Sequence, residues 1–511
     1  MKQVLRLLTN KIVIVGFLII VQVCILLFGV YVLSMFSINA YMVFNALSFV
    51  VGIYVINRSD NPSYKLTWAV TIIGLPIFGW LLYLMFGAKQ VPKALRVRDQ
   101  DLHQDMMNYI EGEIDEYLYL AENDEGAYKQ MNYIWNSSMF PPYGKTKTTF
   151  FASGEANFEE MIARLKAAKE FIFLEYFIID EGYMWSTILE ILEQKVAEGI
   201  DVRLLYDDFG CASKLPNYYD RILNAKGIKT KVFNPIKPRI AVQMNNRDHR
   251  KIFIVDGVVA MCGGVNLADE YINRIERFGH WKDGGAMIEG EAVWSFTLMF
   301  LQFWNFDEKE KDIYAKFHKP REYFKDYEDD GIVQPFSDTP TDNENVGEYT
   351  HINVINNAVD YVYITTPYLV IDQEMKTSLI LAAKNGVDVR ILVPHIPDKW
   401  YVFQLTRHNY LDLTKNGVKI YEYTPGFVHA KNFVADDKYA IVGTTNMDFR
   451  SYYLHYECGI WFYKSSLIMD IKKDYLETLK KSEQITYEMC KQDKIPIKIL
   501  RAILNVFAPL M

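Results

Sequence analysis

The sequence predicts two tandem α/β domains that share one active site and follow a group of amino-terminal transmembrane helices; each domain is expected to have a mixed sheet flanked by helices. Three observations predict this architecture: a charge-free apolar run near the amino terminus, alternating strand-like and helix-like segments after it, and one four-residue pattern that occurs twice. With 511 residues, 50% of them hydrophobic, the chain is long enough for a membrane region and two such domains.

Residues 1–90 form the predicted membrane region. No Asp, Glu, Lys or Arg occurs between Ile12 and Ile56, and this run is about twice as long as one bilayer crossing. Polar residues near its middle mark the expected turn between two spans: Ser34, Ser37 and Asn39. A third charge-free run follows after a short loop, and the expected spans are residues 12–33, 41–56 and 66–86.

The Lys and Arg residues that flank these spans are the sequence evidence for the side of the membrane on which the catalytic part lies. Three crossings leave five Lys and Arg residues on one side and four on the other, so the positive-inside rule does not decide between the sides. If the first run crossed only once, seven positive charges would lie on the side of the catalytic part, against two on the other. We therefore expect a multi-pass protein of the cell membrane with its catalytic part in the cytoplasm.

An acidic connector, residues 91–143, follows the membrane region and is expected to be helical and soluble. Beyond it, residues 198–205 parallel residues 385–392, each a helix end with Gly that leads into a buried strand. Such parallels predict a first α/β domain over residues 144–330 and a second over residues 331–490.

The last segment, residues 491–511, is a basic amphipathic tail in which Lys and Arg alternate with large apolar residues. It is too short and too charged to span a membrane. Two interpretations stay open: an interfacial membrane helix, or a terminal helix packed on the protein core.

The most specific feature is a pattern, His-x-Lys-x4-Asp with an Asn ten residues further on, that occurs twice, 180 residues apart. In an extended segment the His and Lys side chains point to one face and the residue between them points away. One copy alone would indicate a histidine beside a surface lysine, but two copies with identical spacing favour a catalytic pair. The two copies are His249, Lys251, Asp256 and Asn266, and His429, Lys431, Asp436 and Asn446.

These residue types suit phosphoryl chemistry. A histidine with a pKa of ~6.5 can act as a nucleophile or a proton donor near neutral pH, and two histidines can divide those roles. The lysines supply positive charge for the oxygens of a phosphodiester, and Asn266 and Asn446 can add neutral donors as substrate-binding residues. We include Asp256 and Asp436 in the candidate catalytic set, as orienting or structural carboxylates rather than general bases.

Composition narrows the function further. The formal net charge of -8 argues against a nucleic-acid partner, because nucleic-acid-binding proteins normally show a basic balance or a basic stripe. The five cysteines have no paired spacing, and no set of His, Cys and carboxylates shows metal-ligand spacing, so we expect neither a metal nor a cofactor. The sequence gives no indication of the oligomeric state.

The two motifs and their neighbours resemble the phospholipase D superfamily, and within it the bacterial cardiolipin synthases. The resemblance covers roughly Leu66 to Met511 and rests on residues 245–251, 263–266, 269–271, 281–283, 426–431 and 446–451, together with Glu457. It implies two phospholipase D-like domains and a metal-independent phosphatidyl transfer through a covalent phosphohistidine. It also implies that Arg450, Ser451 and Glu457 support the site as a hydrogen-bonded cluster that locks the catalytic loop.

The activity implied by this resemblance is transfer of a phosphatidyl group from one phosphatidylglycerol to another, with cardiolipin and glycerol as products. Phosphatidylglycerol and membrane lipid are then the expected partners. We expect His249 to be the nucleophile and His429 the acid and base, although the symmetric repeats leave the reverse order open. Three alternatives remain: a synthase of phosphatidylserine or another phospholipid, a phospholipase D-type hydrolase, and an inactive membrane scaffold.

Overall fold

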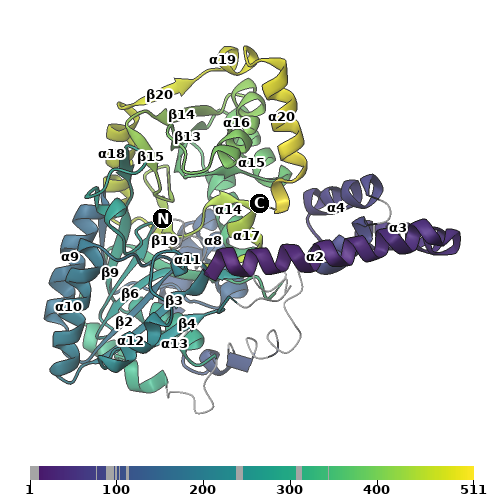
Figure 1. Ribbon diagram of the computed structural model, residues 1–511. Coiled ribbons are helices and arrows are strands. Elements are labelled where there is room, and N and C mark those ends of the chain that lie inside the picture. Colours follow the sequence, from purple (N-terminus) through teal and green to yellow (C-terminus); the bar gives the residue numbers. More distant parts are fainter. Residues whose placement is uncertain are drawn as a thin grey trace.

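The amino-terminal apolar run forms two helices. The computed structural model describes residues 11–75, 78–87, 97, 101–102, 104–110, 114–236, 245–306, 314–342 and 344–510. Helix α2 (Lys11–Phe36) and helix α3 (Ile38–Ile56) meet at Ser37, whose side chain accepts a hydrogen bond from the backbone N–H of Ala40 at 3.2 Å and so caps α3. The break falls at the polar residues where the sequence predicted it. Figure 1 shows both helices extending away from the two sheets.

One helix among the residues searched, α3, is long and apolar enough to cross a membrane. The third predicted span, residues 66–86, is not one helix: α4 (Pro62–Gly74) ends early, and α5 (Gly79–Leu82) and a π-helical turn, η1 (Tyr83–Gly87), follow. At Gly79 a Cβ atom would lie 2.5 Å from the Cα of Ile72, so this glycine lets the chain turn back against α4. The expectation of a single spanning helix was therefore wrong. Helix α4 alone is about 20 Å long, which is shorter than a bilayer core.

The first half of the soluble part is built on a seven-stranded mixed sheet with the order β1-β9-β7-β6-β2-β3-β4. Strands β2, β3 and β4 are parallel to one another, and the other neighbours pair antiparallel. Helices α9 (Gly154–Ala167) and α10 (Tyr183–Ala197) cover its outer face. The strands are β1 (Thr146–Phe151), β2 (Phe171–Tyr176), β3 (Asp201–Asp207), β4 (Lys229–Phe233), β6 (Lys251–Val255), β7 (Val259–Gly263) and β9 (Gly285–Gly290).

The second half repeats this arrangement. Its main sheet has the order β10-β19-β17-β16-β11-β13-β14-β20, in which the run from β19 to β14 matches the run from β9 to β4 in the first sheet. Helices α14 (Val346–Asn357), α15 (Gln373–Lys384) and α16 (Trp400–Lys415) pack on its outer face. The strands are β10 (Ile332–Asp338), β11 (Tyr361–Thr365), β13 (Asp388–Pro394), β14 (Lys419–Tyr423), β16 (Asn432–Ala435), β17 (Tyr439–Gly443), β19 (His455–Tyr463) and β20 (Ser482–Ile485).

The connector is helical where the structure describes it, with α7 (Ile114–Asn123) and α8 (Glu125–Ser138). One face of α8 is buried in the core of the second half, through Ala127, Met131 and Ile134. The connector therefore reaches past the first half in space and joins the layer of helices on the second sheet. This packing buries those apolar residues of α8, while Glu122 and Glu125 stay exposed and Asp124 pairs with Lys438 at 2.8 Å.

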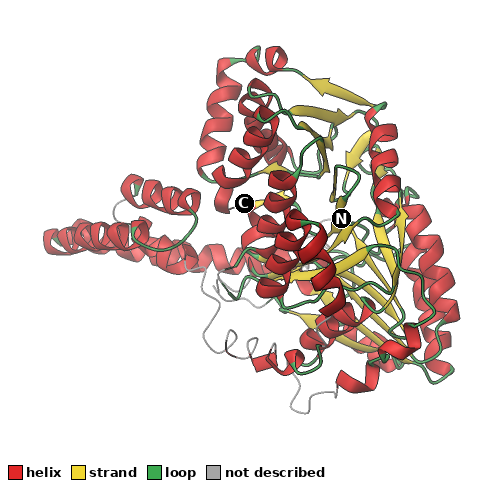
Figure 2. Ribbon diagram, turned by 180° about the vertical axis from the view of Figure 1, so that it is seen from behind, coloured by secondary structure: helices red, strands yellow, loops and turns green. Residues whose placement is uncertain are grey.

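The two halves share a central core. The inner faces of both sheets pack together with α13 (Val293–Trp304), which is buried along its whole length, and with α18 (Leu467–Leu479). Figure 2 shows helices on the outer sides of the two sheets. A large apolar interface of this kind fixes the halves relative to each other, so residues at the inner strand ends can form one site.

The tail forms α19 (Tyr487–Lys491), α20 (Ile495–Val506) and a short 3-10 turn, η6 (Ala508–Leu510). Helix α20 packs on α16 through Arg501, whose guanidinium bonds Gln404 at 3.0 Å, and it meets α4 where Thr67 donates to the carbonyl of Val506 at 2.5 Å. Its opposite face is exposed. The tail thus lies against the protein on one side and leaves an apolar face free on the other.

Candidate active site

Two short pairs of parallel strands join the halves, one directly before each motif histidine. Strand β5 (Arg247–Asp248), directly before His249, pairs with the start of β19 in the second half. Strand β15 (Gly426–Val428), directly before His429, pairs with β8 (His280–Lys282) in the first half. Each histidine therefore follows a strand whose partner belongs to the other half.

The second half positions the His249 ring. The His249 N–H donates to the carbonyl of Tyr456 at 3.0 Å, and Nδ1 of the ring lies 2.9 and 3.0 Å from the two carboxylate oxygens of Glu457. Thr444 donates its hydroxyl to the same carboxylate at 2.5 Å. Because an ionised carboxylate only accepts hydrogen bonds, Nδ1 carries the proton and Nε2 keeps its lone pair.

The first half positions the His429 ring in the same way. The His429 N–H donates to the carbonyl of Lys282 at 2.7 Å, and Nδ1 lies 2.8 Å from Oδ2 of Asp283. Two further donors hold this carboxylate, the indole N–H of Trp281 at 3.3 Å and the backbone N–H of Gly284 at 2.9 Å. Asp283 and Glu457 are fully buried.

These two carboxylates are structural equivalents. The β7–β9 register pairs Gly263 with Gly285, and the β17–β19 register pairs Gly443 with Gly459. Each carboxylate lies two residues before the second glycine of its pair. Asp283 is not among the site residues predicted from the sequence, and Glu457 is predicted only as part of a supporting cluster, although both residues begin an acidic-x-Gly string, Asp283 before β9 and Glu457 within β19.

Burial keeps both histidines neutral. It lowers the pKa of His429 to about 4 and that of His249 well below its usual value, and the positive charges of Lys251 and Lys431 add to the effect. Burial alone would raise the pKa of Asp283, but its contacts with His429 and Lys431 outweigh burial and lower that pKa. A neutral imidazole with its Nδ1 proton on a carboxylate presents Nε2 as a nucleophile or a base.

The two lysines of the motifs are buried and donate from Nζ to the carbonyl of their own histidine, at 2.5 Å in the case of Lys251. Burial lowers the pKa of Lys251 to about 8 and that of Lys431 to about 7, against the opposing effect of nearby carboxylates. Each ammonium has three donors, so one bond to a carbonyl leaves donors for a phosphoryl oxygen. Neither lysine lines the main cavity in this state.

A cavity of about 760 Å³ lies between the halves. Side chains of both halves line it, and five of them are predicted site residues: His249, Asn266, His429, Asn446 and Arg450. His455, which was not predicted as a site residue, lines it as well. Both motif histidines therefore share one site, as the duplication predicts.

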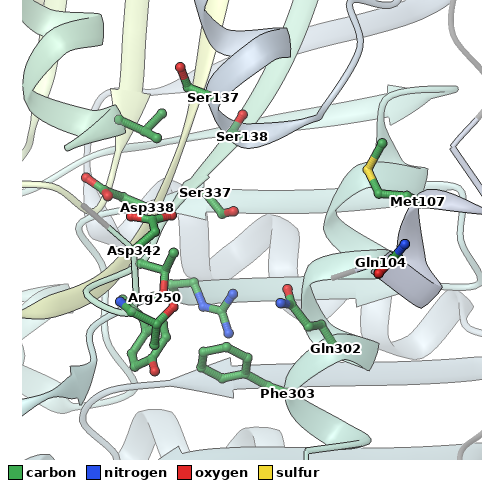
Figure 3. A pocket seen from close by; sticks show the side chains of 14 residues that line it. Gln104, Met107, Ser137, Ser138, Arg250, Gln302, Phe303, Ser337, Asp338 and Asp342 are labelled. Atoms are coloured by element: carbon green, nitrogen blue, oxygen red, sulfur yellow. Dashed lines mark hydrogen bonds between the residues drawn. The ribbon is translucent and has the colours of Figure 1, made fainter. Parts of the chain in front are cut away.

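Arg250 confirms the alternation expected of the His-x-Lys segment. Its side chain points away from the site, where its guanidinium lies 2.6 Å from Glu175 and 3.6 Å from the ring centroid of Phe303. It lines a smaller cavity of about 340 Å³ on the other side of the segment, near Asp338 and Gln302 (Figure 3). This buried ion pair anchors the motif from behind.

The two asparagines differ in how they are held. Asn266 accepts from the backbone N–H of Ile178 at 3.0 Å and donates to the hydroxyl of Tyr271 at 2.8 Å. The side-chain oxygen of Asn446 is buried and has no hydrogen-bond partner within the described part of the chain. Asn446 is thus the better placed of the two to contact a substrate.

Asp256 and Asp436 lie away from the cavity, at the far ends of β6 and β16. Asp256 accepts hydrogen bonds from the backbone N–H groups of residues 169–171 at 2.7 to 2.9 Å, and Asp436 from those of residues 359–361 at 2.7 to 2.9 Å. Including them in the catalytic set was wrong, because each fixes a turn to the start of a neighbouring strand. Their spacing repeats because the turn repeats.

The expected cluster of Arg450, Ser451 and Glu457 is also corrected. Among the described residues no hydrogen bond joins the three: the N–H of Ser451 donates to Asp448 at 2.7 Å and its hydroxyl is unpaired, while Arg450 lines the cavity. Glu457 instead contacts His249 directly. The reason is that Ser451 lies in α17 (Phe449–Tyr453), which turns away before β19 begins.

Comparisons with known proteins find relatives that match both halves of the chain. The family model described as "Cardiolipin synthase, PLD-like domain" matches residues 161–276 and 351–482, and the "Phospholipase D-nuclease N-terminal" model matches residues 46–87. A cardiolipin synthase of Halalkalibacterium halodurans is 31% identical over 90% of this chain and 92% of its own, and an uncharacterized protein of Streptococcus mutans is 45% identical over 90% and 99%.

Among solved structures, the phosphatidylserine synthase of Haemophilus influenzae Rd KW20 is similar, with a TM-score of 0.55 at 15% identity over 76% of this chain and 98% of that one. At this identity the likeness supports the fold. The family match thus includes residues of both halves.

We predict that Glu457→Gln and Asp283→Asn each lower the turnover rate about 10²- to 10⁴-fold, because a neutral amide cannot stabilise the positive charge that develops on the imidazole it contacts. Glu348→Gln is the matched control, since burial raises the pKa of Glu348 to about 9 and the amide resembles the protonated acid. Steady-state rates with circular dichroism on all three variants test this. Equal rates for Glu457→Gln and the control would show that the carboxylate is not needed.

A second prediction concerns the corrected carboxylates. Asp256→Ala and Asp436→Ala should each lower the free energy of unfolding by about 1 to 3 kcal/mol, because each leaves backbone N–H groups without their acceptor. Asp412→Ala, at an exposed position, is the control and should change stability little. Thermal unfolding measures the effect, and a catalytic defect of the folded variants without loss of stability would restore these residues to the reacting site.

Proposed function

Since the chain belongs to the cardiolipin synthase family of the phospholipase D superfamily, we propose that it transfers a phosphatidyl group between two phosphatidylglycerol molecules, releasing glycerol. The observation that carries this proposal is the shared cavity, in which two neutral histidines are each oriented by a carboxylate of the other half. This arrangement supplies one nucleophile and one acid and base for a displacement at phosphorus.

In the first step, Nε2 of His249 attacks phosphorus and forms the P–N bond while the bond from phosphorus to the glycerol oxygen breaks. The bound phosphodiester adds negative charge beside His429, which favours the protonated form of that imidazole and lets it donate a proton to the leaving oxygen. Glu457 stabilises the positive charge that develops on the His249 ring.

In the second step, His429 takes the proton of an incoming phosphatidylglycerol hydroxyl, and the oxygen of that hydroxyl displaces Nε2 of His249. The products are cardiolipin and free enzyme, with His429 protonated for the next cycle. In both steps the ammonium groups of Lys251 and Lys431 stabilise the negative charge that increases on the phosphoryl oxygens. No step requires a metal or a cofactor.

The second part of the proposal places the site at a membrane surface. Helix α20 exposes apolar side chains four residues apart, Ile495 at 73%, Ile499 at 54% and Ile503 at 55%, and the adjacent α4 exposes Leu66 and Ile73. Figure 1 shows α20 and α4 close together, near the carboxyl terminus. Helix α4 also packs on the apolar α3, and we propose that the exposed faces of α20 and α4 rest in the membrane interface.

The same tail links the membrane to the cavity. Leu510 in η6 lines the cavity together with Val402 and Leu405, so an apolar path leads from the exposed face of α20 toward the histidines. Acyl chains could remain near the membrane while the headgroup reaches the site. We also retain a multi-pass arrangement with the catalytic part in the cytoplasm: if α2 and α3 are the two crossings, all nine Lys and Arg residues that flank the apolar runs fall on the side of the catalytic part.

The function is tested with purified full-length protein and labelled phosphatidylglycerol in detergent micelles. We expect cardiolipin and glycerol from the wild type, none from His249→Ala or His429→Ala, and a loss of about 2 to 4 kcal/mol in transition-state stabilisation for Lys251→Ala or Lys431→Ala. Lys481→Ala, an exposed lysine outside the cavity, is the control. Phosphatidic acid as the only product would identify a hydrolase, and wild-type turnover in either histidine variant would reject the shared site.

The lysine pKa values predict the pH dependence. Because the lysines act in their protonated forms, kcat/KM should fall as the pH rises through about 7 to 8, where Lys431 and Lys251 lose their protons in the free enzyme. Below that range it should rise as the pH falls toward about 4, because the protonated form of His429, which donates the proton to the leaving oxygen, becomes more populated in the free enzyme. Lys431→Arg keeps the positive charge and should move the alkaline limb upward, whereas an unchanged limb would exclude Lys431 as its origin.

The interfacial position of α20 predicts a fluorescence signal. In a Cys24→Ser background, a nitrobenzoxadiazole probe attached at Ile503→Cys should be quenched by nitroxide-labelled lipids in proteoliposomes. The same probe at Ile222→Cys, exposed on α12 (Tyr219–Ala225) of the first half, is the control and should not be quenched. Equal quenching at both positions, or none at position 503, would place α20 outside the membrane interface.

A further inference from the structure

A third histidine lies beside His249 and has no part in the reaction proposed above. His455 is 7% exposed, and its Nδ1 has no hydrogen-bond partner in the described part of the chain. That nitrogen lies 3.6 Å from Oε1 of Glu457, and the rings of His455 and His249 have centroids 5.3 Å apart. An unpaired buried nitrogen is unfavourable, and a ligand at this point would satisfy it.

We propose that His249, His455 and Glu457 form a binding site for a divalent transition metal of the Zn²⁺ class, and that the bound ion reversibly inhibits the enzyme. One ligand atom of each residue can be chosen so that all three lie within 4.8 Å of one another. Binding stands on this geometry alone. Only the inhibitory consequence rests on the proposed function.

The three side chains fit such an ion in type and spacing. Two imidazoles and one carboxylate, with a fourth position open, are a donor set typical of Zn²⁺ and unlike the all-oxygen sets that Mg²⁺ and Ca²⁺ prefer. Bond lengths of ~2.0–2.2 Å in a tetrahedron require ligand atoms about 3.3 to 3.5 Å apart. The separations from Glu457 to the two Nδ1 atoms are 2.9 and 3.6 Å, so small shifts suffice.

The backbone holds this geometry before any ion enters. The β5–β19 register places His455 opposite Arg247, two residues before His249, while Glu457 follows two residues after His455 on β19. Both histidines line the cavity, which gives an ion its entry path and leaves the fourth position to water or a phosphodiester oxygen. The site therefore combines ligands from the two halves.

Nearby positive charges weaken the binding of the ion, so the ion binds reversibly and is not a permanent part of the site. Lys251, Lys431 and Arg450 act on His249 or His455 as nearby positive charges, and they oppose a second positive group. A bound ion takes the lone pair of Nδ1 of His249, and the proton that Nδ1 shared with Glu457 moves to Nε2, so the imidazole stays neutral. Nε2 then has no lone pair with which to attack phosphorus, and the ion occupies the carboxylate that would stabilise the developing imidazolium.

The test uses full-length protein in detergent micelles, stripped with chelator and dialysed against Zn²⁺ or Co²⁺. We expect one Zn²⁺ per wild-type chain and the visible absorption of four-coordinate Co²⁺, with binding weakened roughly 100-fold or more in His455→Gln and in Glu457→Gln. His408→Gln, a histidine outside the cavity, is the matched control and should bind as the wild type does. A second substitution, His455→Asn, and circular dichroism guard against loss of folding.

Transfer activity is measured on the same samples. Zn²⁺ should inhibit the wild type over the concentration range in which it binds, and chelator should restore the rate. No binding by wild-type protein, or unchanged binding by both His455 variants, would overturn the proposal. Because dialysis and the Co²⁺ spectrum do not depend on turnover, a chain that binds the ion but makes no cardiolipin would contradict the proposed function and leave the metal site in place.

Discussion

The pairing of each motif histidine with a carboxylate of the opposite half is the constraint on which the site depends. His249 bonds Glu457 and His429 bonds Asp283, in each case next to a backbone hydrogen bond between the same two strands. A single half would hold its histidine without the group that orients it and stabilises its charge. The duplication is therefore a requirement of the chemistry, because neither half contains a complete nucleophile or a complete acid.

This constraint explains other features of the fold. The short pairs β5–β19 and β8–β15 can form only if the two sheets are fixed against each other, and the shared core with the buried helix α13 fixes them. Burial then keeps the histidines neutral and lowers the pKa of Lys251 and Lys431 toward neutrality. Within the protein the ammonium groups of the two lysines are satisfied only in part, so the anionic substrate completes their interactions.

Much of this could be predicted from the sequence, because the motif spacing, the Gly-led strand starts and the break at Ser37 depend on local chemistry. The partner carboxylates could not be found by a fixed offset: 180 residues before Glu457 lies Arg277, since the connection that follows Asn266 is longer than the one that follows Asn446. Asp256 was misassigned because a repeated turn conserves its spacing as strictly as a repeated active site does. The third apolar run suggested one helix, but close backbone packing at Gly79 divides it.

The central claim is that the two halves form one displacement site with His249 as its nucleophile. The most direct measurement is a rapid quench without acid during turnover of phosphatidylglycerol carrying a labelled phosphatidyl group, followed by peptide mass spectrometry. The account predicts a phosphatidyl group on Nε2 of His249, formed and lost more slowly in His429→Ala. Label on His429 alone would reverse the two roles, and the absence of any histidine adduct during active turnover would contradict the covalent mechanism.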